Sequence, residues 1–215
     1  MSTWLARLFC LLVVLGSFVL SQRRDPLEYI LILESAERVK MLQVDRVIQA
    51  LNIEPGQRIA DLGAGSGLFS RPLASQVGPD GVVYAIDIDS DLLEHVNETA
   101  LEKNLTNIQT VLASEQDPRI PDGVDLVLIC DTLHQIEDPS VYLRGLTNYL
   151  RPSARIAVID YENNWPRRFE SAKYTLDDLD KWMMDAGLKR EEQFDFLEDN
   201  FFVIYRYLPE SGVSE

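Results

Sequence analysis

Residues 59–74 read IADLGAGSGLFSRPLA, and this segment constrains the fold more than any other part of the chain. An apolar run that includes Asp61 leads directly into three alternating glycines, Gly63, Gly65 and Gly67. A glycine-rich turn lets the backbone approach a ligand at a distance that a Cβ atom would prevent. The segment therefore predicts a buried strand, a ligand-binding turn and the start of a helix, in that order.

Strand-like and helix-like segments alternate along the rest of the chain. Apolar runs predict strands over residues 58–63, 82–88, 108–113, 124–131 and 154–161. Helical periodicity predicts helices over residues 27–51, 68–77, 90–104, 139–150 and 175–187, with Pro72 in a first turn and Ser90 as a cap. Two aromatic-rich runs around LEDN in residues 188–208 are typical of a hairpin. This order predicts an α/β fold: a doubly wound, mostly parallel, seven-stranded, Rossmann-like sheet with an antiparallel C-terminal hairpin.

The first 24 residues differ from the rest of the chain. Arg7 precedes an apolar run over residues 8–20, which is shorter than the roughly 20 residues that span a bilayer and resembles the core of a signal peptide. An uncleaved anchor that tethers the chain to a membrane is the alternative, and the two arginines after the run leave its orientation open. We expect membrane association or export. The expected divisions are a leader (1–24), a helical segment (25–52), the main domain (53–208) and a tail (209–215).

The composition excludes several classes of partner and site. A net charge of −15 argues against nucleic acid as a partner, because nucleic acid requires clustered Lys and Arg. Cys10 lies in the leader and Cys130 in an apolar run that predicts the core, so no disulfide framework is expected. With only two histidines, and no Cys/His cluster at ligand spacing, no metal site is expected. No feature specifies an oligomeric state.

The spacing of the glycines indicates which ligand the turn accepts. Dinucleotide-binding turns favour G-x-G-x-x-G, whereas this chain has G-x-G-x-G with Asp61 two residues before the first glycine. A carboxylate there would repel a pyrophosphate but attract an amine or a sulfonium. Asp87 ends the next strand, where its carboxylate can accept hydrogen bonds from a ribose, and Ile88 can pack on an adenine. Both ligand classes would use that acid, so it supports a nucleoside without deciding between them.

The segments ADLGAGSG, VVYAIDI and DLVLICDTLH, together with the closing hairpin, resemble the class I methyltransferases that use S-adenosylmethionine. In more detail, ERVKMLQVDRVIQAL, DPRIPDGVDLVLICDTLHQIEDP and DNFFVIYRY resemble small bacterial methyltransferases of unassigned acceptor, many of which start with an export-type leader. The resemblance covers about residues 37–207. It implies methyl transfer from S-adenosylmethionine to a small acceptor.

The resemblance also implies roles for individual residues. Asp61 and Gly63 would hold the methionine moiety, and Asp87 would hold the ribose. Asp131 would close the pocket after the fourth strand. The remaining residues of the implied cofactor site are Ala64, Gly65 and Gly67 in the turn, Ile88 on the adenine, and Ser114 or Glu115 in place of the acidic residue that often reads the adenine amino group.

Candidates for a catalytic role lie where the fourth and fifth strands end, because an open α/β sheet forms its ligand crevice there. A sulfonium methyl is already activated, so an enzyme mainly holds the nucleophile in line and excludes water. His134 is a candidate general base, with a hydrogen-bonded loop histidine as the alternative. The candidates are Asp131, His134, Asp160, Tyr161 and Glu162, and Arg167 and Arg168 are either contacts for an anionic acceptor or part of a solvated loop.

Two other functions compete with methyl transfer. A catalytically silent binding or scaffold protein that kept the fold would explain the leader, because an exported domain would lack a cytosolic cofactor. A nicotinamide oxidoreductase would use the same fold, but the glycine spacing and Asp61 disfavour it. Binding of S-adenosylmethionine or of NADH separates these alternatives.

Overall fold

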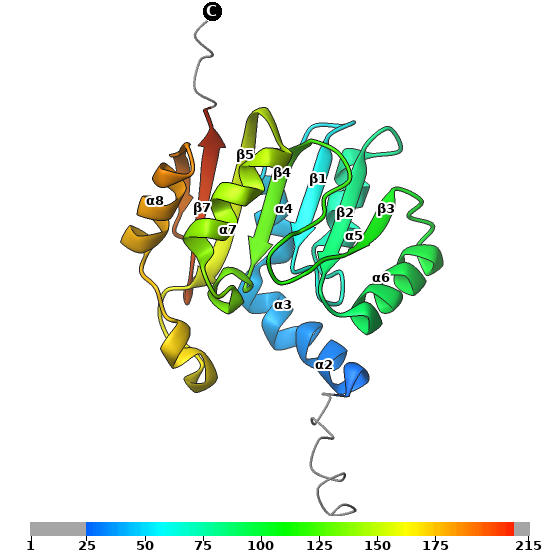
Figure 1. Ribbon diagram of the computed structural model, residues 1–215. Helices are drawn as coiled ribbons and strands as arrows, with labels where there is room; N and C mark the ends of the chain where they lie inside the picture. Colours follow the sequence, from blue (N-terminus) through cyan, green and yellow to red (C-terminus); the bar gives the residue numbers. More distant parts are fainter. Residues whose placement is uncertain (1–24, 209–215) are drawn as a thin grey trace, which may run out of the picture.

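The computed structural model describes residues 25–208, which form one seven-stranded sheet between two layers of helices (Figure 1). The strand order is β3-β2-β1-β4-β5-β7-β6. The first five strands are parallel to one another, whereas β7 runs antiparallel to β5 and β6. The predicted α/β fold and its closing hairpin are therefore confirmed. The bounds are β1 Arg58–Leu62, β2 Val82–Asp87, β3 Ile108–Leu112, β4 Val124–Cys130, β5 Leu150–Tyr161, β6 Leu188–Phe194 and β7 Asn200–Tyr207.

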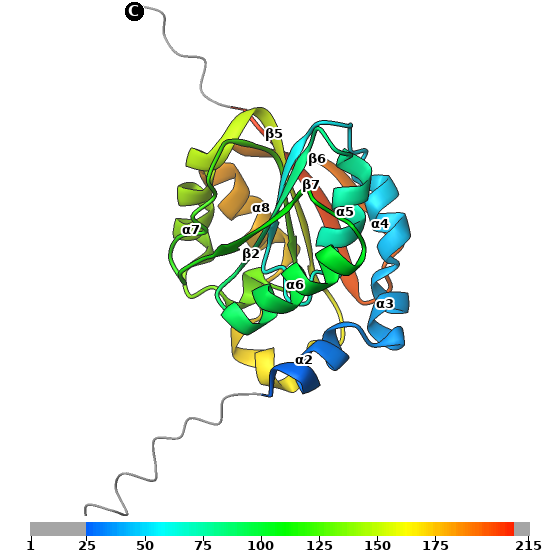
Figure 2. The same ribbon diagram turned by 90° about the vertical axis from the view of Figure 1, so that its right-hand side faces the viewer.

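Helices cover both faces of the sheet, as the view along the sheet shows (Figure 2). One apolar core joins the sheet to α7 (Pro139–Leu146) and α8 (Leu176–Asp185). The opposite core joins it to α3 (Ala36–Leu42), α4 (Val44–Ala50) and α5 (Ser70–Val77). Burial on both faces explains why β4 is almost wholly apolar.

The first strand–turn–helix unit forms as the glycine segment predicts. β1 ends at Leu62, the glycines form the turn, and α5 carries Pro72 in its first turn. The predicted cap of the next helix, α6 (Ser90–Glu102), was wrong by one residue. Asp89 is extended and its side chain accepts a hydrogen bond from the main-chain nitrogen of Asp91 at 2.9 Å, so Ser90 is already helical.

The single helix expected over residues 27–51 is instead three short helices, α2 (Pro26–Leu33), α3 and α4. Ser35 separates the first two because its side chain accepts a hydrogen bond from the main chain of Arg38 and starts a new helix. Gln43 separates the others in a left-handed conformation (φ 42°), and its side chain bonds to the carbonyl oxygen of Phe196 at 2.5 Å. The breaks let the segment bend around the sheet.

The parallel strands end at the lower edge of the sheet in Figure 1, where α2 also lies. The strand order reverses between β1 and β4, which is where open α/β sheets form a ligand crevice. Within residues 25–208, no helix is long and apolar enough to cross a membrane. The expected leader (1–24) and tail (209–215) lie outside the described residues, and the proposed division of the chain stays a prediction.

Candidate functional site

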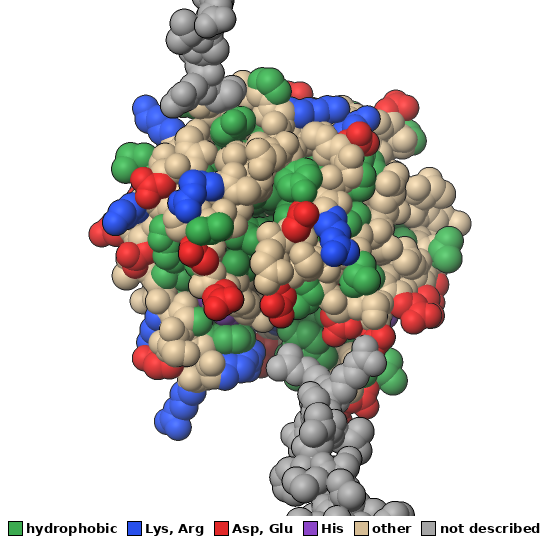
Figure 3. Space-filling model, viewed as in Figure 1, with side chains coloured by type: hydrophobic (Ala, Val, Ile, Leu, Met, Phe, Trp, Pro, Cys, Tyr) green, Lys and Arg blue, Asp and Glu red, His purple; other side chains and the backbone are tan. Residues whose placement is uncertain are grey.

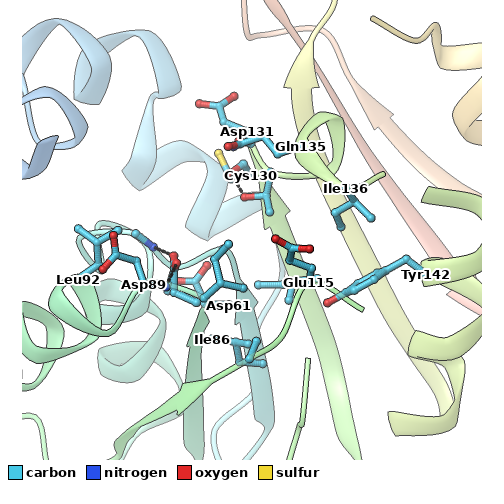
Figure 4. Close-up of a pocket in the computed structure, with 18 of the residues that line it drawn as sticks. Asp61, Ile86, Asp89, Leu92, Glu115, Cys130, Asp131, Gln135, Ile136 and Tyr142 are labelled. Carbon is cyan, nitrogen blue, oxygen red and sulfur yellow. Dashed lines mark hydrogen bonds between the residues drawn. The ribbon is translucent and has the colours of Figure 1, made fainter. Parts of the chain in front are cut away.

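A cavity of about 1020 Å³ opens at the carboxyl ends of β1, β2 and β4 (Figure 4). Its size suits a nucleoside with a second small molecule beside it. Most predicted cofactor residues line it: Asp61, Gly63, Ala64, Gly65, Asp87, Ile88, Ser114 and Glu115, together with Asp131. Acidic side chains are spread across the face of the molecule in Figure 3, several of them near this lower edge.

The glycine turn packs so closely against its neighbours that Gly63 has no room for a side chain. Gly63 has a φ of 74°, and its main-chain nitrogen bonds to the carbonyl oxygen of Ile86 at 2.8 Å. A Cβ atom on Gly63 would lie 2.1 Å from Oγ1 of Thr132, which follows β4. Gly67 does not line the cavity, because it faces Val96 of α6, 3.0 Å from the place of a Cβ atom. Gly67 therefore serves helix packing.

Asp61 provides a buried carboxylate in the cavity wall. Its side chain is 3% exposed, and Oδ2 accepts a hydrogen bond from the Ser70 hydroxyl at 2.5 Å. Burial raises the pKa of Asp61 to about 6, against the opposing effect of the Ser70 hydrogen bond. Among the residues that the structure describes, no Lys, Arg or His forms an ion pair with it. The site therefore offers an anionic group to a ligand cation.

Asp87 braces the glycine turn from the end of β2. Its Oδ2 accepts a hydrogen bond from the main-chain nitrogen of Gly65 at 2.8 Å, and Oδ1 accepts one from Asp89 at 3.0 Å. Burial raises the pKa of Asp87, and these hydrogen bonds oppose the shift. Two carboxylate oxygens have about four acceptor sites, so Asp87 retains capacity for a ligand hydroxyl. Ile88, 60% exposed, follows on the cavity wall.

Ser114 and Glu115 lie on the loop after β3, where Ser114 is held in a turn by Asp117. Asp131 directly follows β4, with a φ of 51°. Its carboxylate accepts hydrogen bonds from Arg38 at 2.8 Å and from the Asn200 side chain at 3.3 Å. Burial raises the pKa of Asp131, and the Arg38 guanidinium opposes that shift. Cys130 is buried as expected and also borders the cavity.

The N-terminal helices contribute to the site, which the sequence did not reveal. Tyr29 and Leu33 of α2 and Arg38 of α3 line the cavity. Leu33 lies 3.1 Å from the place of a Cβ atom on Gly65, so α2 covers the glycine turn. The sequence gives no local signal for this role, because Arg38 is one of several charged residues in the segment and its partner Asp131 is 93 residues away.

His134 lies behind the cavity wall rather than in it. It belongs to η1 (Leu133–Gln135), a short 3₁₀ helix after β4 that places Gln135 on the cavity and buries the His134 ring against Asp160. The other predicted residues near the end of β5 do not border the cavity either: Asp160 is buried, Tyr161 is half-buried, and Glu162, Arg167 and Arg168 are exposed.

Comparison with known proteins gives the family. A family model described as a methyltransferase domain matches residues 53–195, more than half of the chain. The chain belongs to this family. Its members use S-adenosylmethionine as the methyl donor.

Curated relatives of this methyltransferase include the ubiquinone/menaquinone biosynthesis C-methyltransferase UbiE of Ectopseudomonas mendocina, 31% identical over 116 residues. That match covers 53% of this chain and 45% of the relative, so the chain spans about half the length of that protein. A methyltransferase from Aquifex aeolicus described as SAM-dependent has a TM-score of 0.76 at 23% identity, covering 86% of this chain and all of its own. The magnesium protoporphyrin IX methyltransferase of Synechocystis with bound SAM has a TM-score of 0.63 at 20% identity, covering 80% and 81% of the two chains.

Proposed function

We propose that this methyltransferase transfers the methyl group of S-adenosylmethionine to a small acceptor by in-line displacement. The observation that carries the proposal is the Asp61 carboxylate, buried in the cavity wall without a cationic partner among residues 25–208. The cofactor brings two positive groups, the amine and the sulfonium, and an anion in a region of low dielectric favours both.

The residues of the cavity fit the rest of the cofactor. Gly63 lines the cavity without a side chain, so the methionine moiety can lie against its main chain. Asp87 can accept hydrogen bonds from the ribose hydroxyls while it braces the turn. Ile88 offers an exposed apolar surface beside it for the adenine.

The bound cofactor brings an activated methyl group, so the protein has mainly to position the acceptor and to exclude water. Leu33 and Tyr29 of α2 cover one side of the cavity, and the ion pair between Arg38 and Asp131 holds α3 against the end of β4. The acceptor is expected to approach from this edge, where β4 and β5 end.

Transfer of a labelled methyl group from S-adenosylmethionine into a metabolite extract tests the proposal. We expect the full-length wild-type protein to label at least one small compound, and Asp61→Asn to label it far more slowly. A wild type that binds the cofactor but labels nothing would instead support the silent scaffold. Enhancement of NADH fluorescence on mixing would support the oxidoreductase.

We also propose that residues 8–20 direct the chain to a membrane, either as a cleaved signal or as a tether. The length and apolar character of this run support the proposal. Fractionation of cells that express the chain with and without residues 1–24 tests it, and protease protection reports the side that the domain occupies. Recovery of both forms in the same soluble fraction would contradict it.

A further inference from the structure

A buried pair formed by His134 and Asp160 lies beside the cavity, at the ends of β4 and β5. Nδ1 of His134 lies 2.8 Å from Oδ1 of Asp160, and both side chains are fully inaccessible to solvent. The main-chain nitrogen of His134 also contacts Oδ2 at 3.3 Å. Asp160 therefore holds His134 at two points, one on the ring and one on the main chain.

The contacts of Asp160 define which ring nitrogen carries the proton. Besides His134, Oδ1 accepts a hydrogen bond from the main-chain nitrogen of Tyr161 at 2.9 Å, and Oδ2 accepts one from the Tyr174 hydroxyl at 3.0 Å. The two main-chain groups can only donate, and four contacts occupy the acceptor sites of an ionised carboxylate. Asp160 thus directs hydrogen to Nδ1 and leaves the lone pair of a neutral imidazole on Nε2.

Nε2 of His134 is buried and has no hydrogen-bond partner in the part of the chain that the structure describes. Aromatic rings surround it instead: the ring centroids of Phe169, Tyr161 and Trp165 lie 4.2, 5.6 and 5.7 Å from that of the imidazole. A buried polar atom that lacks a partner is costly and uncommon, so it calls for a functional explanation.

The segment that covers Nε2 is held by few contacts. Phe169 belongs to η3 (Arg167–Ala172), a 3₁₀ helix without a buried residue, and Trp165 precedes it. Figures 1 and 2 show this segment, in yellow, below the layers of the fold. Its ring contacts are with His134, Tyr161 and Tyr174. A short segment of this kind can open locally without unfolding the sheet.

We propose that His134 is the general base of the methyl transfer, that residues 165–172 form a lid over it, and that the acceptor carries a hydroxyl on an aromatic ring. This inference rests on the proposed function. The ring of the acceptor takes the place of Phe169 against Tyr161 and Trp165, and its hydroxyl donates to Nε2. Gln135, the sequence neighbour of His134 in η1, borders the cavity, and the proposal requires that opening of the lid joins the base to that cavity.

The proton, the methyl group and the electron pair each have an acceptor in this step. Nε2 takes the hydroxyl proton while the oxygen forms a bond to the methyl carbon, and the carbon–sulfur bond breaks with its electron pair remaining on sulfur. The products are a methyl ether, the neutral thioether of the donor and an imidazolium paired with Asp160. A positioned base of this kind contributes about 10²–10⁴-fold to a rate.

The first experiment measures access to His134 without any cofactor. The full-length protein is treated with diethyl pyrocarbonate, and modification of His134 is followed by mass spectrometry, with His95, the other histidine, as the reference. We expect slow modification of His134 in the wild type and at least tenfold faster modification in Phe169→Ala. Equal rates in the two proteins would show that this segment is not a lid.

The second experiment measures methylation of 2-naphthol as a function of pH. His134→Asn places an amide near Nδ1, keeping a donor to Asp160, but deletes Nε2. We expect kcat to fall at least 100-fold, the acidic limb of the wild-type profile to disappear, and the affinity for S-adenosylmethionine to stay within about twofold. The ionisable groups facing the imidazole from the packed elements are Asp160, Tyr161, Tyr174 and Asp131.

The outcomes are distinguishable. A wild-type rate in His134→Asn would overturn the role of the base. A wild type that binds S-adenosylmethionine and methylates other compounds but not 2-naphthol would overturn the acceptor class. A wild type that does not bind the cofactor would overturn the proposed function itself, whatever the reagent reports about the lid.

Discussion

Two buried carboxylates at the mouth of the sheet have opposite surroundings. Asp131 has a cationic partner in Arg38, 2.8 Å away, whereas the Ser70 hydroxyl is the only side chain within residues 25–208 that hydrogen-bonds to Asp61. Burial raises the pKa of both. The unpaired carboxylate is the one that a ligand cation can compensate, and this difference supports our proposal that Asp61 faces the cofactor whereas Asp131 pairs within the protein.

Affinity for S-adenosylmethionine is expected to increase as the pH rises from 5 to 7. The pKa of Asp61 is about 6, and the cationic ligand favours the ionised form that predominates above this value. Asp61→Asn is expected to lose about 1.5–3 kcal/mol of binding free energy at pH 7 and to bind independently of pH in this range. Calorimetric titration at several pH values measures both. A pH-dependent Asp61→Asn would contradict the assignment, and exposed Asp80→Asn is the control.

The same substitution is expected to stabilise the free protein. The folded-state pKa of Asp61 lies above the value of 3.8 for an ordinary Asp, so the folded state binds the proton more tightly. The stability that Asp61 contributes through this proton is fully present below about pH 4 and is lost as the pH rises through about 6. At pH 7, the free energy of unfolding of Asp61→Asn in urea should exceed that of the wild type by up to about 3 kcal/mol. An equal gain at pH 4 would contradict this explanation.

Gly63→Ala is expected to lower the free energy of unfolding more than Gly56→Ala does. Both glycines have a positive φ, 74° and 83°, so both substitutions introduce about 1–2 kcal/mol of backbone strain. Of the two, Gly63 alone has a neighbour that a Cβ atom would clash with, Thr132, and this overpacking adds about 1–3 kcal/mol. Chemical unfolding of the two variants measures the difference, and equal losses would show that Thr132 moves aside for the new methyl group without a cost.

At the scale of elements, α2 and α3 form a cover that ion pairs join to α5 and to the end of β4. Glu34, which follows α2, lies 2.5 Å from Arg71 of α5, and Arg38 of α3 pairs with Asp131 after β4. Leu33 is held over the glycine turn between these two points. Loss of either pair should loosen the cover while the sheet stays folded.

Glu34→Gln is expected to accelerate hydrogen exchange of the α2 amides about two- to fivefold, because a partly exposed ion pair contributes up to about 1 kcal/mol. Glu28→Gln removes a charge from the same helix, where Glu28 is exposed, and is the matched control. Exchange mass spectrometry of residues 26–34 measures the effect. An equal change in both variants would mean that the Glu34 ion pair does not hold the helix.

Local patterns predicted the elements well, and long-range contacts explain the errors. β1, its glycine turn and α5 follow from neighbouring residues, so sequence alone placed Asp61, Gly63 and Asp87 correctly on the cavity. The break at Gln43 depends on a bond to Phe196, 153 residues away, which no local pattern contains. The turn of η1 likewise buries His134, although its sequence neighbour Gln135 borders the cavity.

At the scale of the whole molecule, the strand order brings the parts of the site together. The reversal between β1 and β4 places the glycine turn beside Asp131, and the next strand, β5, ends with the carboxylate that fixes His134. The cover of α2 and the segment of η3 lie at the same edge (Figure 2). One edge of the sheet therefore carries the cofactor cavity, the candidate base and both covers.

Titration of the full-length protein with S-adenosylmethionine by calorimetry at pH 7 tests the central claim most directly. We predict saturable binding of one molecule per chain with micromolar affinity, strongly weakened in Asp61→Asn and unaffected in Asp80→Asn. The absence of binding at millimolar concentration, or tighter binding of NADH than of S-adenosylmethionine, would contradict the account.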